Sequence, residues 1–250
     1  MNGCATPAER TEALARSRGA TVERIEAGGF EHVLISRPGD DVGTLHIYFS
    51  GDGTPWLHKT QIAADPTPRD PLELRLMLED RSPSVYIGRP CYMGLADSPG
   101  CSPSLWTQGR YSDAVVASMV AAVEQVLAES TARRVVLIGY SGGGVLALLV
   151  ADRVKRVDVV VTIAANLDIA AWSALHGYSP LSTSMNPASV SNWREGLRQI
   201  HLVGENDRNV PPQLVRNFAA DLTDVEVREF EGFDHRCCWV EIWPALLATF

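Results

Sequence analysis

The sequence lacks both a long hydrophobic run and an excess of positive charge. None of its apolar stretches reaches the roughly 18 residues that a membrane-spanning helix needs, and we recognise no signal-peptide core at the N-terminus. Lysine and arginine number 22 against 30 aspartates and glutamates, which gives a formal net charge of −8. Without a basic stripe to neutralise phosphates, we expect neither a nucleic acid nor an anionic membrane surface as a partner.

The usual motifs for cofactors and metals are also missing. The chain has no Gly-x-Gly-x-x-Gly, no P-loop and no His-Glu-x-x-His. It has no Cys-x-x-Cys pair either, which argues against a zinc ribbon or a thioredoxin-like redox site. We therefore expect no cofactor and no metal, and a small molecule as the substrate.

What the sequence does contain is enough apolar material for a large core. Its 250 residues are 46% hydrophobic and 21% charged. A chain of this size and composition is typical of one α/β domain, here residues 1–250. Within that domain we expect residues 1–19 to form an N-terminal helical extension and residues 169–192 to form a small cap-like insertion over the site.

Five cysteines bear on the compartment. The N-terminal Met-Asn-Gly-Cys is similar to the end of a bacterial lipobox, so Cys4 would carry a lipid anchor in a periplasmic protein; the alternative is a cytoplasmic enzyme with free thiols. Four cysteines then remain and allow three pairings. We favour Cys91 with Cys101, which would close a short loop rich in glycine and proline. Cys237 and Cys238 could form a vicinal disulfide, stay free, or pair with the other two.

The order of strand-like and helix-like segments predicts the fold class. Strands are expected at 20–27, 30–36, 44–49, 84–88, 135–138, 157–165, 200–203 and 225–230. Helices are expected at 7–18, 112–130, 142–150, 193–199, 211–221 and 236–250, and a crossover helix that carries Leu72, Leu74, Leu76 and Leu78 is expected within 66–80. After an antiparallel start, strands and helices alternate. This order predicts an α/β fold with a doubly wound, mostly parallel sheet of about eight strands.

The segment 133–150, RRVVLIGYSGGGVLALLV, holds the strongest functional signal. An apolar strand runs into Gly139-Tyr140-Ser141-Gly142-Gly143, and an apolar helix follows. A Gly-x-Ser-x-Gly sequence in a strand-to-helix turn is the nucleophile elbow, in which the serine is exposed above the sheet and the flanking glycines allow the chain to fold back closely. The alternative is a glycine-rich turn with no chemistry.

A serine hydroxyl needs a base, and the base needs an anion to orient it. Asp207 follows a late strand and His235 follows the last one, in the order Ser, Asp, His. Loops at the carboxyl edge of a parallel sheet converge, so both can reach Ser141. Asp168 and Glu205 are the alternative acids.

The other histidines have weaker claims to the role of base. His32, His46 and His201 fall in or beside strands, where a structural role is expected. His58 and His176 lie in loops that could line the pocket, but neither follows a late strand.

An oxyanion hole requires backbone amides on both sides of the serine. The helix that starts at Gly142 supplies one amide and its positive dipole end. The turn after the third strand, Ser50-Gly51-Asp52-Gly53, supplies the other from Gly51 or Asp52.

Together these features resemble the α/β-hydrolase superfamily over residues 48–235. More narrowly, FSGDGTPW, DPTPRDP, GRPCY and FDHRCCW resemble bacterial hydrolase-like lipoproteins of unassigned substrate. The resemblance implies acyl transfer to Ser141, an oxyanion held by the amides of Gly142 and Gly51 or Asp52, and release of the acyl group by water activated at His235. The chain departs from many esterases in lacking a His-Gly start to the turn.

Three functions follow as hypotheses. The leading one is a serine hydrolase that acts on carboxylic esters through an acyl-enzyme. The second is a peptidase or amidase of the same fold, since nothing in the sequence separates amide from ester substrates. The third is a binding protein that keeps the fold without turnover.

Overall fold

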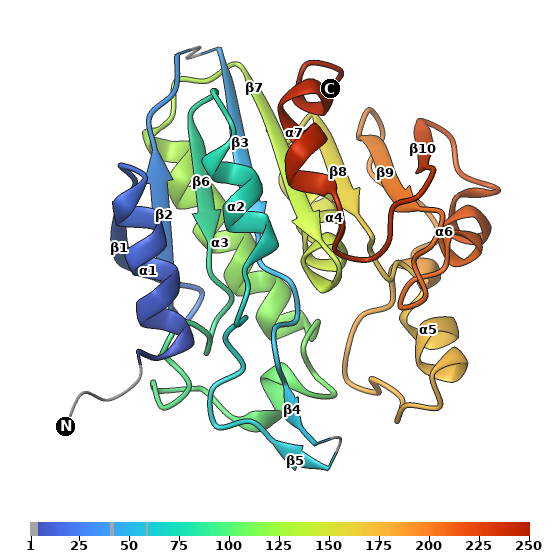
Figure 1. Ribbon diagram of the computed structural model, residues 1–250, viewed down its shortest axis with the longest axis horizontal. Helices are drawn as coiled ribbons and strands as arrows, with labels where there is room; N and C mark the ends of the chain where they lie inside the picture. Colours follow the sequence, from blue (N-terminus) through green and yellow to red (C-terminus); the bar gives the residue numbers. More distant parts are fainter. Residues whose placement is uncertain (1–4, 41–42, 59) are drawn as a thin grey trace.

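The computed structural model describes residues 5–40, 43–58 and 60–250, so the possible lipid-anchor residue Cys4 lies outside the described part. The main sheet has eight strands: β1 (Thr21–Ala27), β2 (Phe30–Arg37), β3 (Thr44–Phe49), β6 (Ser84–Ile87), β7 (Arg134–Tyr140), β8 (Val159–Ile163), β9 (Arg198–Gly204) and β10 (Val225–Phe230). Their spatial order is β1-β2-β6-β3-β7-β8-β9-β10 (Figure 1).

The pairing of these strands confirms the predicted doubly wound, mostly parallel sheet. β1 pairs with β2, and β2 with β6, in antiparallel register. From β6 to β10 all five pairings are parallel. Parallel strands end at one shared edge, and this edge carries the turns that hold the predicted site residues.

Helices cover both faces of the sheet: α1 (Pro7–Ser17), α2 (Leu72–Leu78) and α7 (Trp239–Leu247) on one, and α3 (Asp113–Glu129), α4 (Gly142–Arg153) and α6 (Pro212–Ala219) on the other (Figure 1). The central strand β7 shows why both faces need cover. Val135 and Leu137 belong to the core beneath α3 and α4, whereas Val136 and Ile138 belong to the core beneath α2 and α7. Successive strand residues point to opposite faces, so a strand that is apolar throughout is buried on both.

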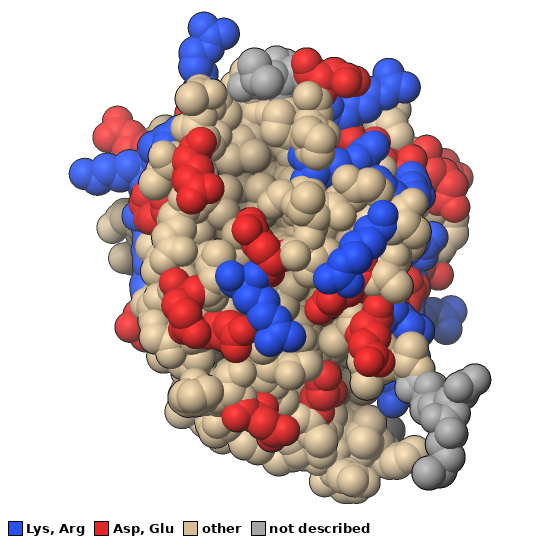
Figure 2. All heavy atoms as spheres, turned by 90° about the vertical axis from the view of Figure 1, so that its left-hand side faces the viewer, with Lys and Arg blue, Asp and Glu red and all other residues tan. Residues whose placement is uncertain are grey.

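The N-terminal helix forms as its sequence predicts. Thr6 Oγ1 accepts a hydrogen bond from the Glu9 amide, and the Glu9 carboxylate accepts one from the Thr6 amide, so the capping box is complete. Pro7 occupies the first turn, where its missing N–H costs nothing. On the face that includes α1 and β1, acidic and basic side chains are interspersed (Figure 2). None of the helices within the described ranges is long and apolar enough to cross a membrane.

The prediction of a helix over residues 193–199 is wrong. Gly196 has a φ of +78°, a left-handed conformation that interrupts a helix, and the Leu197 amide bonds to the Arg194 carbonyl in a turn. Arg194 is fixed instead by its surroundings, because its guanidinium donates to the carbonyl oxygens of Ala151 and Val157. Strand β9 then starts at Arg198.

Several short elements were not expected, and one helix starts later than expected. A hairpin of β4 (Trp56–Leu57) and β5 (Gln61–Ile62) follows the turn after β3. Helix α5 (Ile169–Leu175) and the 3-10 turn η2 (Pro187–Ser189) occupy the segment expected to form a cap, and a second 3-10 turn, η1 (Pro103–Trp106), lies in the loop before α3. Helix α7 starts at Trp239 rather than at residue 236 because Asp234 Oδ1 accepts from the amides of Arg236 and Cys237 and holds them in a turn.

Candidate active site

Ser141 occupies a tight turn between β7 and α4. Its φ of 51° and ψ of −124° lie in a region that non-glycine residues rarely adopt, and such strain concentrates at functional sites. A Cβ on Gly139 would lie 2.2 Å from the Gly143 carbonyl oxygen, and a Cβ on Gly143 would lie 2.3 Å from that of Phe49. Both flanking glycines are therefore required by the close approach of the backbone. The Ser141 hydroxyl makes no capping bond to α4, which leaves it available for chemistry.

Asp207 and His235 come together at the same edge of the sheet. Asp207 follows β9 and is 3% exposed; its Oδ1 accepts from the amides of Asn209 and Val210, each at 2.8 Å. Its Oδ2 lies 2.8 Å from His235 Nδ1. An acceptor at Nδ1 places the imidazole proton there and leaves the lone pair on Nε2, which is the tautomer that a general base requires.

The predicted base and the elbow are adjacent. The ring of Tyr140, which precedes the serine, packs against the His235 imidazole with 5.2 Å between centroids. Among residues 5–40, 43–58 and 60–250, no hydrogen bond joins Ser141 Oγ to His235. Nε2 of His235 instead lies 2.9 Å from Nδ2 of Asn209. Sequence reasoning did not single out Asn209, although it stands two residues after the acid.

The alternative acids have other partners. Asp168 caps α5, where its Oδ1 accepts from the amides of Ala170 and Ala171. Glu205 Oε2 accepts from the amide of Gly232.

The five other histidines divide as the sequence suggested. His32, His46 and His201 are buried on strands, with Gly88, Asp80 and Thr162 as their respective partners. His58 is exposed in a loop. His176 lies nearer the site, because its Nε2 donates to the Asn209 carbonyl oxygen at 2.7 Å.

The turn after β3 lies directly against the elbow. A Cβ on Gly51 would lie 3.3 Å from the Tyr140 carbonyl oxygen and 3.9 Å from Ser141 Cβ. A Cβ on Gly142 would lie 2.0 Å from Asp52 Oδ1. The structure thus brings together the residues predicted to supply both sides of an oxyanion hole; their role as donors stays a prediction.

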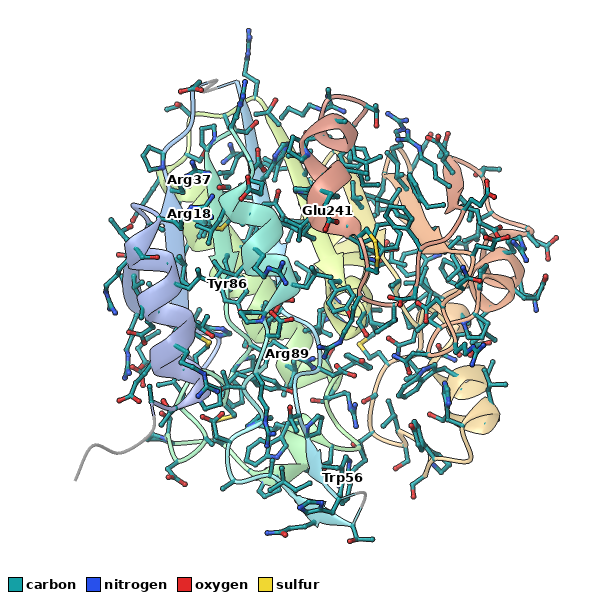
Figure 3. All side chains as sticks on the ribbon, in the orientation of Figure 1. Arg18, Arg37, Trp56, Tyr86, Arg89 and Glu241 are labelled. Atoms are coloured by element: carbon teal, nitrogen blue, oxygen red, sulfur yellow. A yellow bond between two sulfur atoms is a disulfide. The ribbon has the colours of Figure 1, made fainter. Side chains whose placement is uncertain are left out.

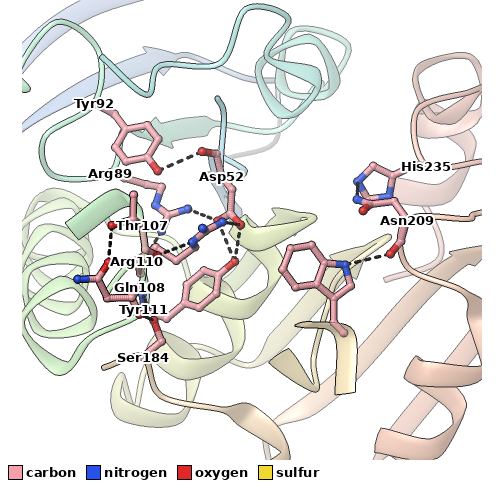
Figure 4. A network of polar contacts seen from close by, with 11 residues as sticks. Asp52, Arg89, Tyr92, Thr107, Gln108, Arg110, Tyr111, Ser184, Asn209 and His235 are labelled. Carbon is pink, nitrogen blue, oxygen red and sulfur yellow. Dashed lines mark hydrogen bonds and ion pairs between the residues drawn. The ribbon is translucent and has the colours of Figure 1, made fainter. Parts of the chain in front are cut away.

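The Asp52 side chain belongs to a network that was not foreseen (Figure 4). Its Oδ1 accepts from Arg89 at 2.6 Å, its Oδ2 from Arg110 at 2.9 Å, and Tyr111 donates its hydroxyl to both oxygens. Its carbonyl oxygen accepts from the Tyr92 hydroxyl at 3.1 Å. Burial alone would raise the pKa of Asp52, but the guanidinium groups of Arg110 and Arg89 lower that pKa to about 2. The carboxylate is therefore charged, and the two arginines leave the cluster with a net positive charge beside Gly142.

A second buried carboxyl lies behind the same turn. Glu73, in the first turn of α2, is 2% exposed, and burial raises the pKa of its carboxyl to about 7 against the opposing effects of the Gly51 amide and the Arg89 guanidinium. Its Oε1 has no hydrogen-bond partner among the residues that the structure describes. Arg89, which opposes the effect of burial on Glu73, lies just beyond the end of β6, the strand that carries Tyr86 (Figure 3).

A small cavity lies beside Tyr140 of the elbow, and exposed apolar side chains lie on the β4–β5 hairpin and on and after α5. A cavity of about 60 Å³ is lined by Asp70, Leu72, Arg75, Tyr140 and Arg236. The large hydrophobic side chains most exposed in the described chain are Trp56 and Ile62 on the β4–β5 hairpin and Leu175 and Tyr178 on and after α5. Both groups lie toward the carboxyl edge of the sheet (Figure 1). No three His, Cys, Asp or Glu side chains in the described ranges are grouped so that they could hold a metal ion.

Comparisons with known proteins agree on the fold. The family described as alpha/beta hydrolase fold matches residues 95–182. An alpha-beta serine hydrolase homologue from Coxiella burnetii is 14% identical, with a TM-score of 0.62 over 92% of this chain and 97% of its own. A proline iminopeptidase-related protein from Thermus thermophilus is 14% identical, with a TM-score of 0.63 over 92% and 98%.

A third solved structure, Est1E from Butyrivibrio proteoclasticus, is 10% identical, with a TM-score of 0.60 over 92% of this chain and 96% of its own. No curated protein sequence matches the chain. At these identities the structural likeness shows the fold alone.

Proposed function

We propose that this chain, which has the α/β-hydrolase fold, is a serine hydrolase that cleaves carboxylic esters through an acyl-enzyme on Ser141. The observation that carries the proposal is the 2.8 Å contact between His235 Nδ1 and the buried Asp207 carboxylate, next to a serine in a strained elbow. A buried aspartate whose other oxygen is saturated by two amides has one partner left to orient, and that partner is the histidine.

The reaction would run as acyl transfer. Ser141 Oγ attacks the ester carbonyl while His235 Nε2 takes its proton, and the tetrahedral oxyanion forms beside the amide of Gly142. His235 then returns the proton to the departing alcohol. In the second half, His235 takes a proton from the water that attacks the acyl-enzyme, and returns it to Ser141 Oγ as the bond to the serine breaks and the acid leaves.

The second oxyanion donor is better assigned to Asp52 than to Gly51. The Gly51 amide already acts on the Glu73 carboxyl, whose pKa it lowers. Within the described chain, the structure gives no hydrogen bond to the Asp52 amide. The net positive charge of the cluster of Asp52, Arg89 and Arg110 also favours a developing oxyanion at this place.

The apolar side chains exposed at the carboxyl edge of the sheet favour an ester with an apolar acyl or alcohol group. Trp56 and Ile62 are each 40% exposed on the hairpin that follows the oxyanion turn. Apolar side chains exposed beside a site are typical of surfaces that bind apolar ligands.

The decisive experiment is active-site titration with a fluorophosphonate, followed by peptide mapping and by cleavage of p-nitrophenyl esters of graded acyl length. We expect stoichiometric labelling at Ser141, and loss of both labelling and hydrolysis in Ser141→Ala. Ser191→Ala, a serine exposed on a loop, is the matched control and should behave as wild type. Well-folded wild-type protein that is neither labelled nor active would reject the proposal and favour a binding protein.

A peptidase or amidase is the alternative within the same chemistry. The same serine, base and acid serve amide substrates, and a related fold occurs in the proline iminopeptidase-related protein. A panel of aminoacyl anilides run beside the esters separates the two, because the substrate with the higher kcat/KM identifies the class.

We also propose that the protein works in an oxidising compartment such as the periplasm, with a lipid anchor at Cys4. The support for the compartment is the disulfide between Cys91 and Cys101, and the support for the anchor is the lipobox-like sequence that ends at Cys4; Cys237 and Cys238 are the two remaining cysteines to be assayed. Mass spectrometry of the unreduced, alkylated protein tests this: four alkylated thiols at these positions would return the protein to the cytoplasmic alternative.

A further inference from the structure

Asn209 makes contacts with three parts of the site at once, and Figure 4 shows it beside one of them, His235. Its amide N–H donates to Asp207 Oδ1 at 2.8 Å, and its side-chain Nδ2 lies 2.9 Å from His235 Nε2. Its carbonyl oxygen accepts from Trp172 Nε1 at 2.9 Å and from His176 Nε2 at 2.7 Å. One half-buried residue thus joins the acid, the base and helix α5.

The contact with His235 involves the atom that the reaction needs. Because His235 donates Nδ1–H to Asp207, its Nε2 carries the single in-plane lone pair and accepts from an amide N–H of Asn209. That lone pair is the one that must take the proton of Ser141. Nε2 cannot serve both donors, so the bond to Asn209 has to break before the serine can be activated.

The position of Asn209 is set by α5. Trp172 on α5 and His176 at its C-cap donate to the Asn209 carbonyl oxygen, and Tyr178 packs against both rings, with centroids 5.3 Å and 5.1 Å away. Tyr178 is 52% exposed, and Leu175 on the same segment is 55% exposed. The aromatic cluster that fixes Asn209 therefore continues to the surface, where a ligand can contact it.

We propose that Asn209 is a positioning residue that acts as a latch on the base. While α5 is docked, the side-chain amide of Asn209 donates a hydrogen bond to His235 Nε2. When an apolar substrate displaces α5, that bond breaks and Nε2 becomes free to accept the proton of Ser141. The proposal rests on the proposed function for its catalytic consequence. The latch itself is a statement about which group bonds Nε2 and can be tested without turnover.

The first test measures the bond directly. In protein with ¹⁵N-labelled histidine, the Nε2 shift of His235 should move toward that of a free lone pair in Asn209→Ala and should be unchanged in Ser141→Ala. Asn217→Ala, on the exposed face of α6, is the matched control and should leave the shift unchanged. A shift that responds to Ser141→Ala and not to Asn209→Ala would overturn the latch, whether or not the protein is a hydrolase.

The second test measures the consequence. Loss of one neutral hydrogen bond that competes for Nε2 should raise the second-order rate of fluorophosphonate labelling about fivefold in Asn209→Ala. Trp172→Phe keeps an aromatic ring but removes the donor to the Asn209 carbonyl, and it should raise the rate in the same direction by a smaller factor. Asn209→Ala labelling at or below the wild-type rate would overturn the latch while leaving the serine hydrolase in place. Absence of labelling in every variant would instead reject the proposed function, and the Nε2 shift would still decide the latch.

Discussion

The Asp52 carboxylate lies so close to Gly142 that a Cβ on this glycine would stand 2.0 Å from Oδ1 and 2.5 Å from the Tyr111 hydroxyl. Neither neighbour can move away cheaply, because Tyr111 and two arginines hold the carboxylate. This contact joins the turn after β3 to the start of α4, the two segments expected to supply the oxyanion donors.

We therefore expect Gly142→Ala to push the two segments apart. Loss of one oxyanion donor typically lowers the rate of the reaction about 100-fold or more. The rates of Ser141 labelling and of ester hydrolysis should therefore fall by at least that factor, while the circular dichroism spectrum stays native. Gly51→Ala is the matched comparison, because its Cβ would come no closer than 3.3 Å to a neighbouring atom, the Tyr140 carbonyl oxygen. Wild-type labelling in Gly142→Ala would show that this contact does not set the oxyanion site.

The cluster of Asp52, Arg89 and Arg110 should dominate the electrostatic contribution to stability. Arg89 is fully buried and Asp52 is only 17% exposed, so Asp52→Asn leaves two guanidinium groups without their counter-charge. Breaking a buried ion pair in this way costs about 3 kcal/mol of the free energy of unfolding. Asp113→Asn removes the exposed partner of Arg153 and should cost under about 1 kcal/mol. Urea unfolding of both variants checks the contrast, and equal losses would contradict it.

The disulfide between Cys91 and Cys101 closes a short loop next to Arg89. Its sequence separation is 10, and a cross-link of that length restricts the unfolded chain by about 3 kcal/mol in the chain-entropy account. We expect the Cys91→Ala, Cys101→Ala double variant to lose about that amount in chemical unfolding. Cys237→Ser, Cys238→Ser is the comparison; adjacent cysteines close almost no loop, so it should lose much less. A reversed order would show that the first pair is not formed.

The local parts of this structure could be predicted from the sequence. The elbow is encoded by glycines at fixed spacing around Ser141, because only glycine avoids the backbone contacts that the turn creates. Capping boxes and β-branched runs are local in the same sense, and both α1 and the parallel strands formed where they were expected. The meeting of Asp207 with His235 could be predicted because both residues follow strands that end at one edge of the sheet.

What could not be predicted depends on contacts between distant residues. Asp52 bonds to Arg89 and Arg110, which are 37 and 58 positions away, and no local pattern records those pairs. Asp168, considered as an acid because it follows a strand, proved to cap α5, a helix too short to show a period. The helix expected over residues 193–199 failed because one glycine in a left-handed conformation outweighs several residues that fit a helix.

The buried Glu73 carboxyl should make stability depend on pH in an unusual direction. Its pKa is about 7 in the folded protein against 4.5 for an exposed glutamate. Between these two values the folded protein keeps a proton that the unfolded chain releases, so the contribution of Glu73 to stability falls as the pH rises from about 4.5 to about 7. Above pH 7 the penalty is complete and amounts to about 3 kcal/mol, since each pKa unit corresponds to about 1.4 kcal/mol.

Glu73→Gln keeps the shape of the side chain and cannot ionise. We expect it to stabilise the protein by up to about 3 kcal/mol at pH 8 and to change the free energy of unfolding little at pH 4. Glu124→Gln, on the exposed face of α3, removes the same charge from water and should have a small effect at both values. Urea unfolding of the three proteins at the two pH values decides the matter. If Glu73→Gln has the same effect at pH 4 and pH 8, the pKa of the carboxyl does not differ between the folded and the unfolded protein, and the polar groups of the turn after β3 must stabilise its charged form.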